Sequence, residues 1–161
     1  MRHWLVSSGF LLAGLLAGGT DEALAQVPPR LAGRWQAQQI SLLARRVVSH
    51  EVQEQMNDSA IAVTNGELRH GALRQVVEFQ PEGTYRYEQT RKGQPSRTEA
   101  GTYAVRQNVI EGHSPGTAGG SSFARWHIAQ LGRRQLVLEQ PIWADSLRIS
   151  QQIEFRRLPA P

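Results

Sequence analysis

The chain has 161 residues and a formal net charge of +4, and it contains no cysteine. This length favours a single domain, and 40% hydrophobic with 20% charged residues is the composition of a globular protein. The lack of cysteine excludes a disulfide framework, a thiolate zinc site, a thiol nucleophile and a lipid-modified N-terminal cysteine. The excess of basic residues raises the question of an anionic partner such as nucleic acid.

The first 25 residues have the pattern of a signal peptide. A short basic start at Arg2 precedes an apolar stretch over residues 4–18, and Ala23-Leu24-Ala25 then provides a cleavage site before Gln26. The apolar stretch is shorter than the roughly 20 residues of a membrane-spanning helix, and glycines interrupt it. We therefore predict cleavage after Ala25 and export to the periplasm or the extracellular space. An uncleaved N-terminal anchor is the alternative.

The predicted mature domain comprises residues 26–161. Cleavage removes Arg2, Asp21 and Glu22, so the formal net charge rises to +5. The arginines occur singly or in pairs with acidic residues between them, and no basic run carries aromatic residues. This distribution argues against nucleic acid as a partner. No segment of the mature chain is apolar enough to predict a transmembrane helix.

Most of the mature chain alternates apolar and polar residues in short runs separated by turn residues, which is the pattern of β-strands. The clearest two runs form a hairpin from Val76 to Tyr87, with Pro81-Glu82-Gly83 as its turn. Folding about this turn places Phe79 opposite Tyr85, and such cross-strand aromatic pairs fix the register.

Further runs predict an all-β fold, an up-and-down antiparallel barrel of about eight strands. The interior of a barrel of this size is filled by side chains or holds one small ligand. The remaining strands are expected over Gly101–Val105, Phe123–Ala129, Leu136–Leu138 and Ile149–Arg157, with a tight turn at Arg106–Val109 and loops at Gly112–Gly120 and Ile142–Ser146.

The stretch from Ile40 to Arg74 departs from the alternating pattern. Its first part, Leu42–Val48, can extend the first strand. Ser49 is a suitable N-cap for a short helix over His50–Met56. The segment Glu67–Arg74 is either a helical turn or a loop. We therefore expect a short irregular or helical insert after the first strand.

Five motifs in order resemble those of bacterial lipocalin-like domains, which are calycin-type β-barrels. They are Leu31-Ala32-Gly33-Arg34-Trp35 with its G-x-W pattern, Phe79–Tyr85, Gly101–Val105, Leu136–Leu138 and Phe155–Leu158. The resemblance implies a lipocalin-like barrel in which Trp35 closes one end beneath an arginine of the last strand. Arg157 has the same parity as the inward-facing Phe155, so we expect Arg157 rather than Arg156 over the indole, in a structural role.

Aromatic and aliphatic side chains share the inward parity of the predicted strands. One interpretation is a packed core, and the other is a cavity in which tyrosine hydroxyls orient a small hydrophobic or amphipathic ligand. We predict the cavity. Its candidate lining residues are Phe79, Tyr85, Tyr87, Tyr103, Trp126, Ile128, Leu138 and Phe155.

Other residue patterns give no indication of catalysis or metal binding. The four histidines of the mature chain, His50, His70, His113 and His127, lack the spacing of a metal site. No convergent carboxylate pair or activated nucleophile is evident, so we predict neither enzymatic activity nor a cofactor. The alternative function is an interaction or inhibitor module that binds another envelope protein through the barrel loops.

Overall fold

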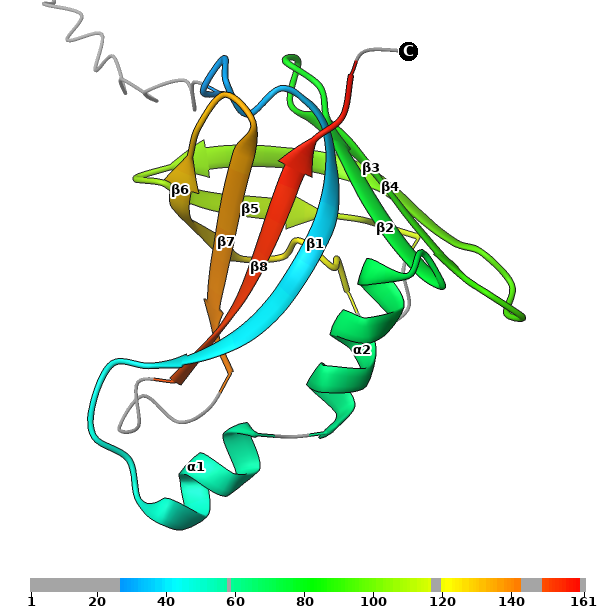
Figure 1. The fold of residues 1–161 in the computed structure, drawn as a ribbon. Helices are drawn as coiled ribbons and strands as arrows, with labels where there is room; N and C mark the ends of the chain where they lie inside the picture. The colour runs from blue at the N-terminus through cyan, green and yellow to red at the C-terminus, as the bar shows by residue number, and fades with distance from the viewer. Residues whose placement is uncertain (1–26, 58, 117–119, 143–148, 160–161) are drawn as a thin grey trace, which may run out of the picture.

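A computed structural model describes residues 27–57, 59–116, 120–142 and 149–159. The predicted signal peptide and parts of two predicted loops lie outside the described residues. Eight antiparallel strands form one closed barrel in which neighbours in sequence are neighbours in the sheet and β8 pairs with β1 (Figure 1). This topology confirms the predicted up-and-down barrel. The strands are β1 (Gly33–Ala44), β2 (Leu73–Phe79), β3 (Thr84–Arg91), β4 (Arg97–Arg106), β5 (Val109–His113), β6 (Trp126–Leu131), β7 (Gln135–Pro141) and β8 (Ile149–Arg157).

Two helices connect β1 to β2. The first, α1 (His50–Met56), has the predicted bounds and the predicted cap, since the Ser49 side chain accepts a hydrogen bond from the Val52 amide at 3.4 Å. The second, α2 (Ser59–Arg69), was not predicted; the segment Glu67–Arg74, expected as either a helical turn or a loop, contains the last turn of α2 and the start of β2. None of the helices in the described ranges is long and apolar enough to cross a membrane.

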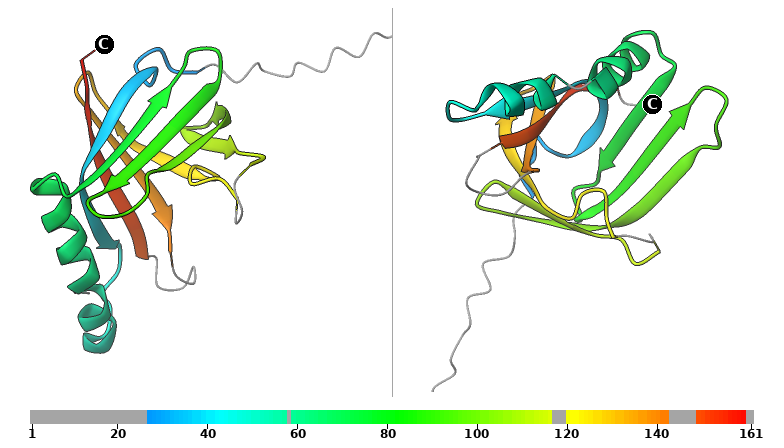
Figure 2. Two further views of the ribbon diagram at one scale, coloured as in Figure 1. Left: turned by 90° about the vertical axis from the view of Figure 1, so that its right-hand side faces the viewer. Right: turned by 90° about the horizontal axis from the view of Figure 1, so that it is seen from below.

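Helix α2 lies against the barrel where β1 and β2 separate (Figure 2). β1 pairs with β2 only over Gly33–Gln36. Farther along β1, the side chain of Asn65 takes the place of a strand partner. Its Oδ1 accepts a hydrogen bond from Ile40 N, and its Nδ2 donates to Ile40 O, both at 2.8 Å. Leu68 of the same helix is buried in the core. Helix α2 therefore covers the part of β1 that does not pair with β2.

The β2–β3 hairpin has the predicted register, with Phe79 opposite Tyr85. Its turn depends on Gly83, which has a φ of 86°, a conformation that favours glycine. A second glycine, Gly101 on β4, faces Tyr85 across the sheet. A Cβ atom at position 101 would lie 2.9 Å from the Tyr85 ring and 2.0 Å from the carbonyl oxygen of His113. The absence of a side chain at Gly101 therefore makes room for the aromatic ring.

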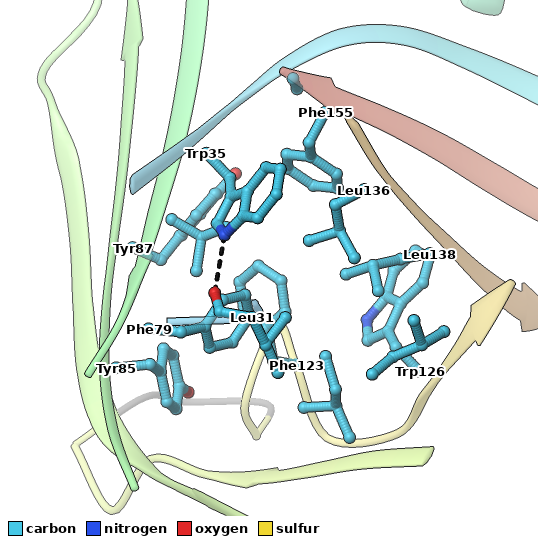
Figure 3. Packing of buried hydrophobic residues seen from close by; sticks show 14 of the residues in the cluster. Leu31, Trp35, Phe79, Tyr85, Tyr87, Phe123, Trp126, Leu136, Leu138 and Phe155 are labelled. Atoms are coloured by element: carbon cyan, nitrogen blue, oxygen red, sulfur yellow. Dashed lines mark hydrogen bonds between the residues drawn. The ribbon is translucent and has the colours of Figure 1, made fainter. Parts of the chain in front are cut away.

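One end of the barrel is closed by Trp35, which is fully buried and donates a hydrogen bond from Nε1 to the Leu31 carbonyl at 2.8 Å (Figure 3). The guanidinium of Arg157 lies 4.2 Å from the centroid of the indole. The same guanidinium donates to the carbonyls of Ala32 and Arg133 at 2.8 and 2.9 Å and to that of Arg30. It therefore ties the leader and the β6–β7 turn to the end of β8.

Gly33 lies two residues before this tryptophan, at a position that favours glycine. It has a φ of 128°, and a Cβ atom there would lie 2.4 Å from Nη1 of Arg157. Both the backbone conformation and the space occupied by the arginine therefore require glycine.

On the outer surface, Glu139 of β7 is buried beneath Arg45, which follows the end of β1. The guanidinium of Arg45 bonds both carboxylate oxygens, at 2.7 and 2.9 Å, and Ser150 and Gln152 of β8 donate to the same group. Burial raises the pKa of Glu139, but these donors outweigh the burial and hold the pKa below its ordinary value. The cluster joins β1 to β7 across β8.

Candidate ligand cavity

The barrel contains a cavity of about 170 Å³ in the half that lies away from Trp35. The strands β1, β2, β3, β6, β7 and β8 contribute to its wall, together with the segment that precedes β6. Apolar side chains predominate, and the polar ones are two glutamines, one tyrosine and one serine. The lining residues are Ile40, Gln75, Tyr87, Ser122, Phe123, Trp126, Leu138, Gln151, Ile153 and Phe155.

Half of the candidate lining residues named from the sequence form part of this wall. They are Tyr87, Trp126, Leu138 and Phe155. The other four, Phe79, Tyr85, Tyr103 and Ile128, are also buried, but they pack in the core outside the cavity wall. Phe79 and Tyr103, for example, have ring centroids 5.0 Å apart in an edge-on arrangement.

Phe123 packs against aromatic side chains of the core and also lines the cavity. Its ring lies 5.7 Å from Phe79, 5.5 Å from Tyr85 and 5.6 Å from Tyr87, measured between centroids, and all three contacts are edge-on. Edge-on aromatic pairs add to the stabilisation from burial itself. Figure 3 shows Phe123 in the middle of the barrel, with Trp126 on one side of it and the tyrosines on the other. Phe123 therefore belongs both to the cavity wall and to the packed core.

The three inward-facing tyrosines all have hydrogen-bond partners. Tyr85 donates to Glu99, Tyr87 donates to Gln89 Oε1 at 2.9 Å, and Tyr103 donates to the carbonyl of Gln80 at 2.8 Å. Burial raises the pKa of each phenol to about 12, so all three are neutral at physiological pH. Of the three, Tyr87 is the one whose side chain lines the cavity.

Glu99 holds the segment that carries Phe123. Its side chain is fully buried, and it accepts hydrogen bonds from Ser121 Oγ at 3.0 Å, from Ser122 N at 2.9 Å and from Ser122 Oγ at 2.7 Å. Burial raises the pKa of this carboxyl, but the hydrogen bonds from Ser122, Tyr85 and Ser121 outweigh it and hold the pKa below its ordinary value. The charged carboxylate therefore anchors this wall of the cavity.

Six lining residues were not among the candidates from the sequence. Ile153 has the same inward parity as Phe155 on β8. Gln75 and Gln151 have inward parity too, and that parity is the signal that identifies them. Ser122 and Phe123 belong to a loop rather than to a strand, and Ile40 lies beyond a register shift in β1, so alternation did not identify these three.

The described residues contain no group of three or more histidine, aspartate or glutamate side chains placed to hold a metal ion. The cavity wall is mostly apolar and carries a few neutral polar groups. These features are typical of sites for small organic molecules.

The eight-stranded up-and-down barrel, closed at one end by Trp35 beneath Arg157, agrees with the lipocalin-like fold that the sequence motifs implied. No known family's model matches the chain, and no curated protein matches it either. Among solved structures it is similar to a lipocalin-like protein from Bacteroides uniformis, at 16% identity and a TM-score of 0.49, covering 80% of this chain and 99% of that one. An uncharacterized protein from Bacteroides eggerthii is similar at 12% identity and a TM-score of 0.45, with the same coverage of both chains.

Proposed function

We propose that this protein is an exported, lipocalin-like binding protein that holds a small hydrophobic or amphipathic molecule inside its barrel. The observation that carries this proposal is the cavity of about 170 Å³ beside the packed core. An apolar cavity of about 150 Å³ is large enough for benzene. The expected ligand is thus of the size of one six-membered ring with a short substituent.

The position of the cavity supports this role. The opposite end of the barrel is filled by Trp35 and the core, whereas Gln75, Gln151 and Ile153 of the cavity wall are only half buried. A ligand can therefore enter from the end that these three residues surround, without disturbing the closed end. Transfer of its apolar surface from water to the wall would drive binding.

Export is supported by the signal-peptide pattern before Gln26. Intact mass measurement of the protein from its own host tests this part. We expect a mature N-terminus at Gln26, in the periplasmic or extracellular fraction. A full-length chain retained in the cytoplasm would contradict it.

Native mass spectrometry of the same preparation tests ligand binding. We expect an adduct of low molecular mass on the wild-type protein that is lost from Ile153→Trp, because the larger ring would occupy the cavity. Val109→Trp is the matched control, since Val109 is half buried on β5 and lies outside the cavity wall. A stoichiometric protein partner without any small-molecule adduct would instead favour the loops as the binding surface.

A further inference from the structure

We infer that the cavity selects neutral ring compounds that carry both a hydrogen-bond donor and an acceptor, such as a primary carboxamide, over charged analogues and plain hydrocarbons. This inference rests on the proposed ligand-binding function and names the chemical class of the ligand. It is carried by two pairs of inward-facing glutamines, which we call the glutamine rim: Gln75 with Gln89, and Gln140 with Gln151.

Each pair of the glutamine rim lies directly across two neighbouring strands. Gln75 is opposite Gln89 in the β2–β3 register, and Gln140 is opposite Gln151 in the β7–β8 register. The amide of Gln75 donates to Gln89 Oε1 at 3.2 Å, and that of Gln140 donates to Gln151 Oε1 at 3.3 Å. The two pairs therefore flank β1 on either side, where Ile40 lines the cavity between them.

The glutamine rim retains hydrogen-bonding capacity. A primary amide has two N–H donors and an oxygen with two lone pairs. Among the described residues, the pairing leaves Gln75 Oε1 without a donor and Gln151 Nε2 without an acceptor. Gln89 Oε1 also accepts a hydrogen bond from the Tyr87 hydroxyl at 2.9 Å, which favours this orientation of the first pair. One member of each pair lines the cavity, so an acceptor and a donor are both available to a ligand there.

The described lining residues carry no charged side chain. The nearby carboxylate of Glu99 is already bonded by Tyr85, Ser121 and Ser122, and Arg97 lies 3.6 Å from it. A charged ligand would lose its hydration without gaining an opposite charge, which is strongly unfavourable. A neutral ligand avoids this cost.

The wall therefore has an apolar part and a polar part. Phe123, Trp126 and Leu138 are buried, whereas Gln75 and Gln151 are half buried at the end from which the ligand enters. A ring would lie against the buried part, and its amide group would lie between the two glutamines. A hydrocarbon of the same size would leave both amides unsatisfied or dependent on water.

Four probes of nearly equal size test the inference by calorimetric titration of the mature protein at pH 7: benzamide, benzoate, benzamidine and toluene. We expect benzamide to bind at least about tenfold more tightly than the anionic benzoate and the cationic benzamidine. We expect it to bind about three- to tenfold more tightly than toluene, as one or two hydrogen bonds would give.

The double variant Gln75→Leu with Gln151→Leu should remove the preference. Benzamide should then bind no more tightly than toluene, and retained toluene binding shows that the variant is folded. Gln130→Leu is the matched control, because Gln130 is an exposed glutamine of β6 outside the cavity, and it should keep the wild-type order. Equal affinity of all four probes for the wild-type protein would overturn the inference and leave the proposed function standing. Absence of binding by every probe would overturn both.

Discussion

The side-chain amide of Asn65 in α2 forms the same pair of hydrogen bonds with the backbone of Ile40 that a neighbouring strand would form, each at 2.8 Å. The pair lies beyond Gln36, where β1 and β2 no longer pair. Ile40 also lines the cavity. One helical side chain therefore substitutes for a strand at the position where the barrel wall meets the candidate ligand.

Replacement of Asn65 by leucine should destabilise the protein by about 2 kcal/mol, because the amide and carbonyl of Ile40 lose their partners in a partly buried position. Denaturant unfolding measures the loss, and hydrogen exchange should show faster exchange of the Ile40 amide. Val63→Leu, at an exposed position of the same helix, should change neither quantity. An Ile40 amide that stays equally protected in the Asn65 variant would contradict this assignment.

The contacts at the closed end of the barrel lead us to expect that two neighbouring arginines contribute very differently to the free energy of unfolding. Arg157→Ala removes the contact with Trp35 and three hydrogen bonds to carbonyls, and we expect a loss of about 2 kcal/mol or more in the free energy of unfolding. Arg156→Ala, at an exposed position, should cost less than about 0.5 kcal/mol. Similar losses for both variants, measured by denaturant unfolding, would show that Arg157 has no special role at this end.

Acid should weaken the structure through Glu99. The folded-state pKa of Glu99 is below its ordinary value, so the group contributes stability that is complete above the unfolded pKa of about 4.3 and is lost as the pH falls through the folded value. We expect Glu99→Gln to be less stable than the wild type at pH 7, and the difference to shrink at pH 3. Unfolding free energies at the two pH values measure this change.

The exposed Glu111 provides the control for this experiment. Glu111→Gln should follow the wild-type stability at both pH values. A stability difference between Glu99→Gln and the wild type that is the same at pH 7 and pH 3 would rule out a contribution from the ionised carboxylate.

Local patterns in the sequence predicted much of the fold. The turn at Pro81–Gly83 fixes the hairpin register from neighbouring residues alone, and Ser49 marks the start of α1. Parity along β8 was sufficient to choose Arg157 over Arg156. The second helix was missed because its apolar residues form no clear stripe, and because α2 is held in place by Asn65 and the buried Leu68 rather than by its own pattern.

The cavity was harder to predict than the barrel. Alternation identified the inward-facing side chains, but it does not distinguish those that pack together, such as Phe79 and Tyr103, from those that surround a space. Gln75 and Gln151 have inward parity, but the candidate lining residues predicted from the sequence were aromatic and aliphatic only. The burial of Glu99 depends on donors from Ser121 and Ser122, which are distant in sequence and join it only in the folded chain.

The central claim is that a small ring binds inside the barrel, and intermolecular NOEs test it most directly. With benzamide at saturating concentration, we expect contacts from the ring protons to the methyl groups of Leu138 and Ile153 and to the indole of Trp126. NOEs confined to exposed methyl groups, such as those of Val47 and Val63, or no saturable binding at all, would contradict the account.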